Sequence, residues 1–558
     1  MKKRCTLACL FIICQLGANA QFSRYIVQFS NKKGTAYSLS NPAAFLSQRA
    51  IERRVRQNIP IDSTDLPVSK DWLDSLRAIA GVTIISTSKW LNQACIQTTS
   101  PGALATINSF SFVKKTNGIA PRVSEPADKK LDTVITRLPP SGSRIRQAQG
   151  ITSLDYGDMF NQIHIHEGEY LHNLGYTGRG IQIAVMDAGF QNYKFNPVFD
   201  SLRLQSRLLG EWDFVMNEAS VNEDNSHGAL VLSVIAGNRP GVMVGSAPHA
   251  SYWLLRTEDV SGEYPIEEQH WAVAAEFADS AGVDMISSSL GYDTFDNPAF
   301  NYSYAQRNGN TAMITRAADM AAQKGILVVS SAGNSGGASS ELRFVGAPAD
   351  GDSVFTVGGI DVNGNIYAYS SWGPNGAGRQ KPNAVSVAVG TVVATTAGNA
   401  GSGTGTSFAC PNLAGLMACL WQAFPEFSNM EIFEAVQQSA DRYTNPDGRF
   451  GYGVPNFRKA HEQLSQLRNK DSLLTKNWMR AYPVPARTDG FRLLLKAPAS
   501  GRAALRLVNA VGQVLETRRL DVVEGQTYVE DYKLVLARGI YYIQYDDGVN
   551  KRTLPVMR

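Results

Sequence analysis

Hydrophobic and polar positions follow different patterns in successive parts of the chain. From residue 21 to 121, short apolar runs such as RYIVQF and VTIIST alternate with stretches of helical period such as SKDWLDSLRAIA. This alternation predicts a small α+β unit of about 100 residues. Residues 122–150 are polar, contain four arginines and a Pro-Pro pair, and keep no period, so we expect an exposed linker there.

Between residues 151 and 465 the pattern changes to apolar strands, each followed by a helical stretch. Examples are IQIAVMD before HGALVLSVIAG, and VDMISSSLG before TRAADMAAQKG. Several of these strands are apolar without alternation, which a parallel sheet covered by helices on both faces requires. After a polar linker over 466–479, alternating strands such as FRLLLKA and GIYYIQYD fill residues 480–558 and predict a small β-sandwich. The main fold is therefore expected to be α/β, flanked by the two smaller units.

The first twenty residues have the pattern of a cleaved signal peptide. Three basic residues precede an apolar run over residues 5–17, and Ala18-Asn19-Ala20 forms a small-residue cleavage site. A membrane anchor is the alternative, but these 13 mainly apolar residues fall short of the roughly 20 that span a bilayer. No later stretch is long and apolar enough. We therefore expect an exported protein with no membrane span after signal cleavage.

Charge and cysteine content change once this segment is removed. The full chain has 53 basic and 49 acidic residues, and loss of the signal peptide leaves 50 against 49. Such a balance excludes a protein whose main binding partner is nucleic acid. Three of the six cysteines also lie in the first twenty residues. Cys410 and Cys419 are nine residues apart on a predicted helix, about 13 Å and too far for a disulfide. With Cys95, they are expected to be three free, mostly buried thiols.

Three reactive side chains lie where α/β sheets place their sites, at strand carboxyl ends and helix starts. Asp187 ends the strand IQIAVM, His227 begins an apolar helix, and Ser407 follows the glycine-rich run 401–405 just before another helix. Nucleophilic hydrolysis needs a hydroxyl, an imidazole that takes its proton, and a carboxylate that orients the imidazole. The order Asp, His, Ser, with spacings of 40 and 180 residues, is the order of subtilisin-like enzymes.

The segments VMDAGF, SHGALV, SSSLG, SSAGNSG and GTSFACP, in this order, resemble the subtilase family of serine peptidases. The resemblance implies a subtilisin-like fold that hydrolyses peptide bonds of protein or peptide substrates, with Asp187, His227 and Ser407 as the catalytic triad. It implies that Asn334 supplies the amide of the oxyanion hole, which stabilises charge formed near the transition state. It also implies that the Ser289-Leu290-Gly291 segment pairs with an extended substrate through main-chain hydrogen bonds.

This chain departs from the family pattern beside each member of the triad. Ala188 follows the aspartate where the family usually has a small polar residue, Ala229 stands where it has threonine, and Phe408 where it has methionine. None of these changes removes a reacting group. They are expected to change the hydrogen bonding around the triad, and through it the rate of the reaction.

Two other motifs suggest metal sites without completing them. The segment HIHEGEYLH resembles a zinc-binding helix, but Tyr170 stands where the second histidine is needed. Asp361, Asn363 and Asn365 suggest a calcium turn, although a solvated loop is the favoured interpretation. We therefore expect no metal in the active site and no cofactor, while a structural calcium ion is possible but cannot be assigned to residues.

The amino-terminal unit, residues 21–121, is similar to propeptides of subtilases from Bacteroidetes in its segments LSQRAIERRVRQ and SKWLNQA. This implies that the chain's own propeptide is a partner of the peptidase domain and is cut off within residues 122–150. An unrelated interaction domain is the alternative.

The carboxyl-terminal unit, residues 480–558, resembles the sorting domain of the type IX secretion system. Tyr482-Pro483, Arg538-Gly539-Ile540-Tyr541 and the basic ending Lys551-Arg552 carry the resemblance, although Val484 stands where the family usually has asparagine. It implies that secretion machinery carries the protein across the outer membrane, to the medium or the cell surface. An adhesion module is the alternative for this unit.

The sequence as a whole predicts a secreted serine endopeptidase. Two other functions remain open: a catalytically silent binding protein that keeps the fold, and a protease whose only substrate is its own propeptide. The substrate preference has no readable motif.

Overall fold

The structure, a computed structural model, describes residues 22–121, 136–137, 154–476, 478–487, 490–533 and 535–558. The chain divides into two compact units, residues 1–461 and 462–558. The expected signal peptide and most of the expected linker over 122–150 lie outside the described residues. No helix within the described ranges is long and apolar enough to cross a membrane.

The amino-terminal part of the first unit is a four-stranded antiparallel sheet in the order β2-β3-β1-β4. Its strands are β1 (Arg24–Phe29), β2 (Thr83–Ser88), β3 (Gln93–Gln97) and β4 (Val113–Ala120), and its helices are α2 (Gln48–Arg56), α3 (Lys70–Arg77) and α4 (Pro101–Ser109). Serine side chains cap the first turns of all three helices, as helix starts favour.

Alternation along β1 gives this sheet two buried faces. Tyr25 and Val27 pack with Leu76 of α3 and Ile107 of α4, while Ile26 belongs to a different cluster on the opposite face. Successive side chains of a strand point to opposite faces. The predicted α+β unit is therefore present, and its second face is available to pack on the rest of the molecule.

The centre of the first unit is a seven-stranded sheet in the order β14-β13-β12-β11-β6-β10-β7, in which every pairing is parallel. The strands are β6 (Gln182–Asp187), β7 (Leu208–Asp213), β10 (Ser251–Arg256), β11 (Met285–Ser288), β12 (Leu327–Ser331), β13 (Val354–Ile360) and β14 (Ala384–Val387). Most of them are buried along their whole length, as the unbroken apolar runs predicted.

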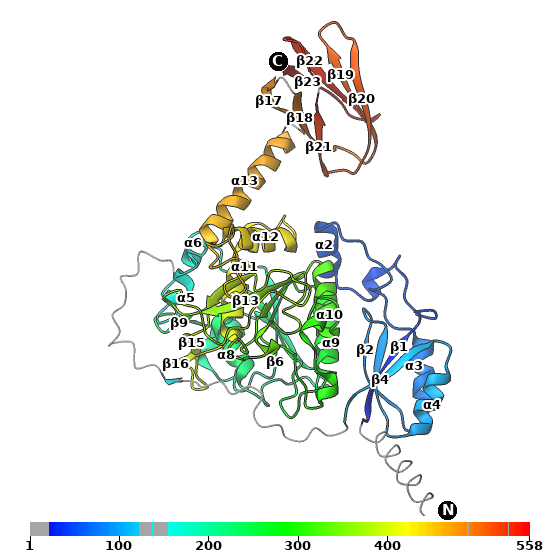
Figure 1. Cartoon of the computed structure of the whole chain (residues 1–558), viewed down its shortest axis with the longest axis vertical. Coiled ribbons are helices and arrows are strands. Elements are labelled where there is room, and N and C mark those ends of the chain that lie inside the picture. The colour runs from blue at the N-terminus through cyan, green and yellow to red at the C-terminus, as the bar shows by residue number, and fades with distance from the viewer. Residues whose placement is uncertain (1–21, 122–135, 138–153, 477, 488–489, 534) are drawn as a thin grey trace, which may run out of the picture. The chain divides into compact units, whose positions relative to one another are not determined.

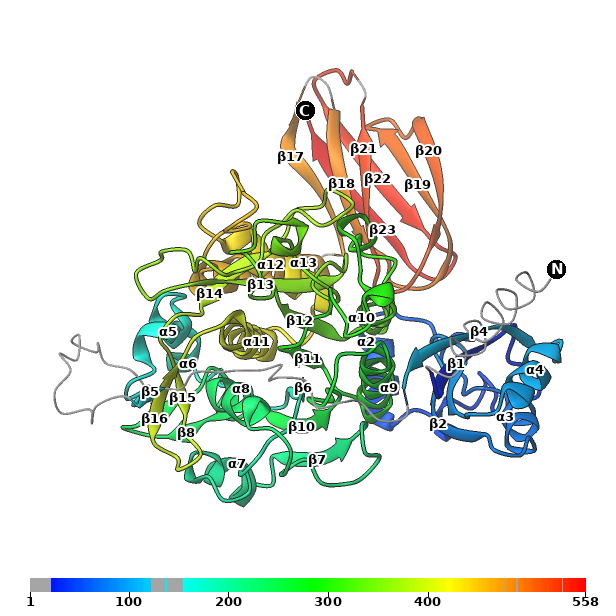
Figure 2. The same ribbon diagram turned by 60° about the horizontal axis from the view of Figure 1, so that its bottom comes forward.

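Helices cover both faces of this sheet (Figures 1 and 2). One face carries α8 (His227–Ala236) and α11 (Thr406–Ala423), which pack on each other, and the other carries α9 (Ile266–Ala281) and α10 (Met313–Gln323). The remaining elements are α5 (Phe160–His164), α6 (Gly168–Asn173), α7 (Asp200–Leu204), α12 (Asn429–Ser439), β5 (Thr136–Arg137), β8 (Asn238–Arg239), β9 (Met243–Val244), β15 (Thr391–Ala394), β16 (Ala400–Gly403) and short 3-10 turns. The predicted α/β fold class is confirmed.

The face of the amino-terminal sheet that carries Ile26 packs against α9. The Glu276 carboxylate accepts hydrogen bonds from the Ser88 hydroxyl at 2.5 Å and from the backbone amides of Lys89 at 2.7 Å and Trp90 at 3.0 Å. Glu276 of α9 therefore caps the turn between β2 and β3, and its side chain is buried there.

Buried ion pairs join α2 to the same helix. Both Arg53 and Arg54 have almost no exposed surface, and both guanidinium groups bind the Asp279 carboxylate; Arg54 contacts it at 2.9 Å. Arg54 also reaches Asp65 at 2.8 Å, which Lys324 contacts at 3.0 Å. Buried charges of this kind are tolerated because each is paired and hydrogen-bonded.

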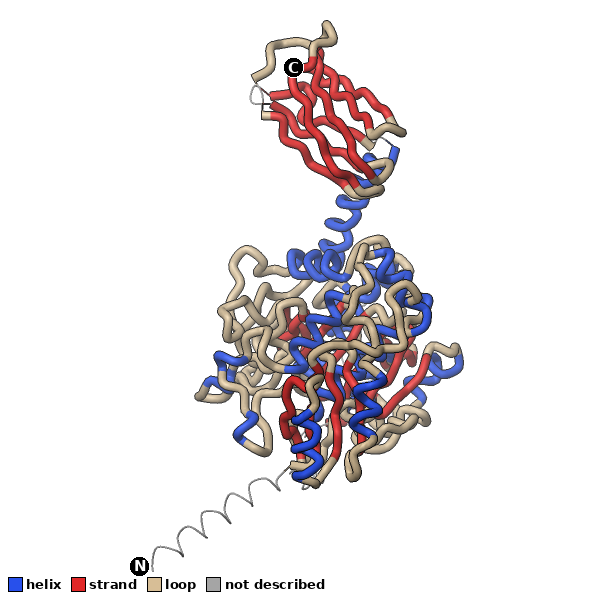
Figure 3. Tube along the Cα trace, turned by 90° about the vertical axis from the view of Figure 1, so that its right-hand side faces the viewer, coloured by secondary structure: helices blue, strands red, loops and turns tan. Residues whose placement is uncertain are grey.

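The second unit contains α13 and a β-sandwich. Helix α13 (Phe457–Lys476) starts in the first unit and runs through most of the stretch expected as a polar linker. One sheet holds β17 (Met479–Arg487), β18 (Gly490–Lys496) and β21 (Thr527–Tyr532), and the other holds β19 (Gly501–Asn509), β20 (Val514–Val522), β22 (Ile540–Asp546) and β23 (Lys551–Met557). All pairings are antiparallel, and the strands appear red in Figure 3.

The inner faces of the two sheets form one apolar core. Leu493 and Leu495 of the first sheet belong to the same buried cluster as Leu505, Leu507 and Ile543 of the second. The predicted sandwich is confirmed.

The cysteines behave as predicted. Cys95, Cys410 and Cys419 are free and buried. Burial raises the pKa of the Cys95 thiol to about 12, so it stays protonated at neutral pH and acts as a packing residue.

Candidate active site

Asp187 lies at the carboxyl end of β6, in the middle of the parallel sheet. Its side chain has no exposed surface, and its Oδ1 accepts a hydrogen bond from the Ala188 amide at 2.8 Å. Its Oδ2 is buried without a hydrogen-bond partner among the described residues. The departure at Ala188 is relevant here, because alanine brings no hydroxyl to this crowded carboxylate.

His227 begins α8 and faces Asp187. Its Nδ1 lies 2.7 Å from Asp187 Oδ1, so the Nδ1 proton donates to the carboxylate and Nε2 is left to exchange a proton. Burial alone would lower the pKa of His227, but the Asp187 charge, its hydrogen bond and the more distant Glu258 charge outweigh it, and the pKa is raised above the usual value.

A glycine makes this contact possible. A Cβ atom on Gly228 would lie 2.5 Å from the Gly189 carbonyl oxygen and 2.9 Å from the Asp187 Cβ. Only a residue without a side chain lets the start of α8 approach the end of β6 so closely.

Ser407 lies in the first turn of α11, directly after β16. Gly405 has a φ of +151°, a backbone conformation that favours glycine, and the chain turns there from strand into helix. Ser407 is only 7% exposed, and its carbonyl accepts a hydrogen bond from the Ser289 hydroxyl at 2.8 Å. No hydrogen bond joins Ser407 to His227 in the described chain. Such bonds are often long in unliganded sites and tighten when substrate binds.

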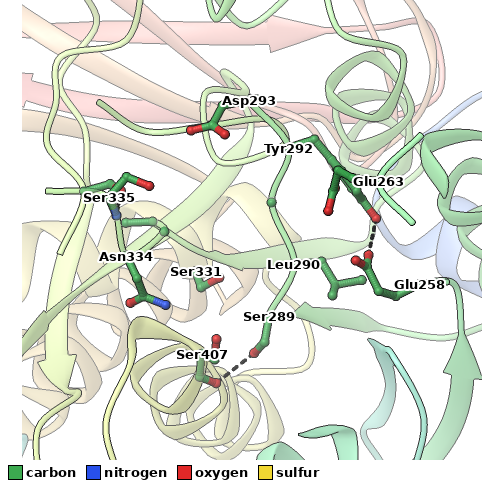
Figure 4. A pocket seen from close by; sticks show the side chains of 15 residues that line it. Glu258, Glu263, Ser289, Leu290, Tyr292, Asp293, Ser331, Asn334, Ser335 and Ser407 are labelled. Atoms are coloured by element: carbon green, nitrogen blue, oxygen red, sulfur yellow. Dashed lines mark hydrogen bonds between the residues drawn. The ribbon is translucent and has the colours of Figure 1, made fainter. Parts of the chain in front are cut away.

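Asn334 follows β12 on a turn that includes Gly333, whose φ is +100°. The Asn334 Oδ1 accepts hydrogen bonds from the Thr406 amide at 2.9 Å and the Thr406 hydroxyl at 3.1 Å. Because the oxygen is held by the residue before Ser407, the Nδ2 amide is left as a donor on the Ser407 side (Figure 4). Thr406 therefore fixes the orientation of the Asn334 side chain. It lies in the motif GTSFACP, but the sequence analysis gave it no role.

The predicted substrate segment follows β11. Ser289, Leu290 and Gly291 line a cavity of about 160 Å³ together with Asn334 and Ser407. After Gly291 the chain pairs with another loop, since Tyr292 and Ala347 exchange backbone hydrogen bonds of 2.7 and 3.0 Å. Leu290 and Gly291 donate no backbone hydrogen bond to the rest of the described chain, which leaves their amides available to a peptide.

The site residues thus fall into two groups. Ser407, Asn334 and the 289–291 segment line the cavity, whereas Asp187 and His227 are not among its lining residues and meet each other beside it. All of them lie on segments that begin or end at the carboxyl edge of the sheet, where α/β folds place their sites.

Three acidic residues beside this cavity were missed by the sequence motifs. Glu258, Glu263 and Asp293 line it, and Glu258 follows the carboxyl end of β10 by two residues. The rule that identified Asp187, a polar residue after an apolar strand, could also have identified Glu258. The segment has no motif to draw attention to it.

Metal ligands were considered in two places. Glu258, Glu263 and Glu267 form the one group of three acidic, histidine or cysteine side chains, among the described residues, whose ligand atoms lie within 4.8 Å of one another. In the suspected calcium turn, Asp361 Oδ1 accepts from the Asn363 and Asn365 amides at 2.9 Å each, and Oδ2 accepts from the Asn365 side chain at 3.0 Å. The Asp361 carboxylate is therefore engaged by its own loop, which fits a hydrogen-bonded turn better than a calcium site.

Comparison with known proteins gives two family matches and a set of related proteases. Residues 178–453 match the subtilase family, and residues 24–133 match the peptidase S8 propeptide domain of Bacteroidota. Among the relatives, alkaline elastase YaB of Bacillus sp. (strain YaB) is 30% identical over 289 residues, which are 51% of this chain and 66% of the relative. Subtilisin E of Bacillus subtilis (strain 168) is 29% identical over 294 residues, 52% of this chain and 68% of the relative.

The subtilisin of Bacillus pumilus is also 29% identical over 294 residues, and there the match covers 94% of the relative. The chain thus spans about two thirds of the first relatives and nearly all of this one. The match confirms that a propeptide domain precedes the peptidase domain. It extends past the expected end at residue 121, to residue 133. The chain therefore carries a subtilase domain, the domain of a serine-type endopeptidase, preceded by a propeptide domain of the Bacteroidota type.

Proposed function

We propose that the chain is an exported serine endopeptidase whose catalytic triad is Asp187, His227 and Ser407, with Asn334 in the oxyanion hole. The observation that carries this proposal is the 2.7 Å contact between Asp187 and His227 beside a cavity lined by both Ser407 and Asn334. No cofactor is needed, because every group in the reaction belongs to the chain.

In this reaction the Ser407 Oγ attacks the carbonyl carbon of the scissile peptide bond, and His227 Nε2 takes the hydroxyl proton. Asp187 holds the Nδ1 proton and stabilises the imidazolium. The electron pair of the C=O bond moves to oxygen, where the Asn334 Nδ2 and the Ser407 backbone amide donate hydrogen bonds; amides in the first turn of a helix lack intrahelical partners. The C–N bond then breaks, and His227 gives its proton to the leaving amine.

The resulting acyl-enzyme is hydrolysed by the same groups. A water molecule gives its proton to His227 and attacks the ester carbon, and the Ser407 oxygen leaves with the proton that His227 returns. The extended peptide is held along Ser289, Leu290 and Gly291 by main-chain hydrogen bonds, as in other strand-addition complexes.

The test compares the chain from residue 21 onward with its Ser407→Ala variant, in a casein digestion and on gels. We expect the wild type to digest casein and cut its own amino-terminal unit, and Ser407→Ala to do neither. Ser402→Ala, a serine on β16 outside the cavity lining, is the matched control and should digest casein. Equal behaviour of wild type and Ser407→Ala would contradict the triad and favour a binding role. Self-cutting without casein digestion would favour a protease that processes only itself.

We propose that residues 21–121 act as a propeptide that helps the peptidase domain to fold and stays on it until the chain is cut within residues 122–150. The match to the Bacteroidota propeptide family, the cap that Glu276 forms on residues 88–90 and the buried ion pairs of α2 support this role. The peptidase domain proper would then be residues 151–465.

We propose that residues 1–20 are a signal peptide and that residues 480–558, after a linker over 466–479, are a type IX sorting domain. The β-sandwich has its own apolar core, which supports a separate sorting domain. Secretion machinery would then carry the protein across the outer membrane. Deleting residues 480–558 should leave casein digestion intact but hold the enzyme in the periplasm. Normal release of the truncated enzyme would instead favour the adhesion alternative.

A further inference from the structure

We infer that Glu258 is a positioning residue for the peptidase reaction. By accepting a hydrogen bond from the Tyr292 hydroxyl, it holds the 289–292 segment in the place where an extended substrate pairs with that segment. Glu258 would act through this segment and not on the reacting atoms. The inference rests on the proposed function, because the position of the segment matters to the reaction only if a peptide binds along it.

The 289–292 segment is anchored at both of its ends. At one end the Ser289 hydroxyl donates to the Ser407 carbonyl at 2.8 Å. At the other end the Tyr292 hydroxyl donates to the Glu258 carboxylate. The two residues between these anchors donate no backbone hydrogen bond to the rest of the described chain, so their amides are the groups that an extended peptide can use. The two anchors therefore set where these amides lie.

The Tyr292 side chain is held in one direction. It is buried and belongs to the apolar cluster that also contains Leu290 and Phe295. The Phe295 ring lies nearly parallel to the Tyr292 ring, at a centroid distance of 6.2 Å. Burial, and after it the Glu258 charge, raises the pKa of Tyr292 well above its usual value, so the hydroxyl keeps its proton and donates it. A buried hydroxyl without an acceptor would cost free energy.

Glu258 is a fixed acceptor because it directly follows an element of the central sheet. It lies two residues after β10, and the Thr257 amide beside it donates to the Asp187 carbonyl at 3.0 Å. Strand β10 pairs in parallel with β6 along its whole length, up to Arg256 opposite Asp187. The hydrogen bond from Tyr292 therefore connects the end of β10, beside Asp187, to the segment that receives the substrate.

The neighbouring carboxylates fix the loop that follows Glu258. Figure 4 joins Glu258 to Glu263, and Glu267 accepts from the Asp259 amide at 2.8 Å and from the Tyr264 amide at 3.1 Å. Of these three glutamates, Glu258 is the one that accepts a hydrogen bond from the 289–292 segment. The role is therefore assigned to this hydrogen bond and not to the charge of the group.

Loss of the hydrogen bond should weaken peptide binding more than catalysis. Main-chain pairing needs the Leu290 and Gly291 amides in line with the substrate. Ser407 and Asn334 lie on the other side of the segment from Glu258 (Figure 4). An interaction that is equally strong in the ground state and in the transition state changes KM and leaves kcat unchanged. A substrate too small to pair with the segment should not respond.

The test compares two conservative variants of the chain from residue 21 onward, after it has cut itself. Tyr292→Phe removes the hydrogen bond and keeps the Glu258 charge, whereas Glu258→Gln removes the charge and keeps an oxygen that accepts from Tyr292. One substrate is an internally quenched peptide that copies a bond cut in casein, with the four residues before it. The other is p-nitrophenyl acetate, which has no peptide group to pair with the segment.

We expect Tyr292→Phe to raise the KM for the peptide about 10-fold, as for the loss of a hydrogen bond to a charged group, with kcat and acetate hydrolysis nearly unchanged. Glu258→Gln should lose clearly less on the peptide. Tyr302→Phe is the matched control, because the Tyr302 hydroxyl donates to Glu268 at 2.8 Å and its ring packs against the same apolar cluster, outside the cavity lining. Its KM for the peptide should equal that of the wild type.

An unchanged peptide KM in Tyr292→Phe would overturn the inference. So would equal losses on the peptide and on p-nitrophenyl acetate, which would mean that the substitution disturbs the whole site. A larger loss in Glu258→Gln than in Tyr292→Phe would assign the role to the charge of Glu258. Each of these results leaves the proposed function intact, because the wild type still cuts the peptide. If the wild type cuts neither casein nor the peptide, the proposed function fails and the inference fails with it.

Discussion

The acidic residues of α9 that face the amino-terminal unit and the acidic residues beside Ser407 meet different partners. On α9, Asp279 binds two buried guanidinium groups and Glu276 accepts three hydrogen bonds, all from residues 53–90. Beside the cavity, Glu258 and Glu263 lie within 4.8 Å of the Glu267 carboxylate in the first turn of α9, and Glu258 accepts a hydrogen bond from the Tyr292 hydroxyl. The first group is paired with residues of the amino-terminal unit, whereas Glu258 and Glu263 line the cavity that also contains Ser407. Isosteric substitutions of a carboxylate at the candidate active site and of one on α9 can separate a catalytic role from a structural one.

The largest expected effect is on turnover, from Asp187→Asn. The amide cannot stabilise the imidazolium and favours the wrong tautomer of His227, so kcat should fall by about 10⁴-fold. Removal of the carboxylate also removes what raises the pKa of His227. Because activity needs neutral His227, the acid limb of the residual pH–rate profile should move to lower pH. Steady-state kinetics across pH would check both, and an unchanged acid limb would contradict the assigned pairing.

The matching substitution on α9 is Asp279→Asn. It leaves Arg53 and Arg54 buried without their shared carboxylate charge, so the uncut chain should lose about 3 to 5 kcal/mol of unfolding free energy. Chemical denaturation should be measured in the Ser407→Ala background, where the chain stays whole. Asp74→Asn, which breaks an exposed pair with Lys70, is the control and should change little. If Asp279→Asn and Asp74→Asn lowered the unfolding free energy equally, burial would not be what makes the Asp279 ion pairs important.

A third substitution, Asn334→Ala, tests the donor that Thr406 holds in place. The amide contributes only when charge develops on the substrate oxygen, so kcat should fall by about 100- to 1000-fold with little change in KM. A loss confined to KM would show that Asn334 binds the substrate and does not stabilise the transition state.

The smallest effect concerns pH and the amino-terminal unit. Burial raises the pKa of Glu276 to about 7, against hydrogen bonds from residues 88–90 that lower it. Once the units separate, this carboxyl faces water and titrates near its ordinary value of about 4.5. The associated state then binds the extra proton, so association weakens as pH rises from about 4.5 to 7, by at most about tenfold per pH unit, and stays level above.

Gel filtration of the cut protein at several pH values would measure the fraction of amino-terminal unit still bound. Glu276→Gln should remove the slope below pH 7, whereas Glu434→Gln, at an exposed glutamate on α12, should keep it. The pKa of Lys32, which burial lowers to about 8, affects only a higher pH range. A slope that persists in Glu276→Gln would assign the titration to another group.

The sequence predicted the central sheet well because several of its strands are unbroken apolar runs followed by helices. The strand ending at Asp187 and the helix starting at His227 have these boundaries in the structure. Strands with mixed patterns, such as β4 and β7, did not stand out, since they are only partly buried. Helix α13 fills most of an expected linker because a polar stretch can be helical without an apolar stripe strong enough to reveal it.

The site divides in the same way. Asp187, His227, Ser407 and Asn334 each lie in a short motif, and glycines such as Gly405 mark where the backbone must turn tightly. The glutamates beside the cavity lie in no such motif, and Thr406 lies in the motif GTSFACP without having been given a role. Their importance depends on what lies opposite them, which is set by loops that come together from distant parts of the chain.

The sequence by itself therefore determined the order of elements, the α/β class and the candidates for the reactive residues, because apolar periodicity and glycine-rich turns are local properties. The tertiary structure alone decided which charges face one another. It brought Arg53 to Asp279 across 226 residues and Thr406 to Asn334 across 72, and it gathered Glu258 and Glu263 beside Ser407. Such contacts depend on the packing of whole elements, because an electrostatic partner is defined by distance and burial and not by position along the chain.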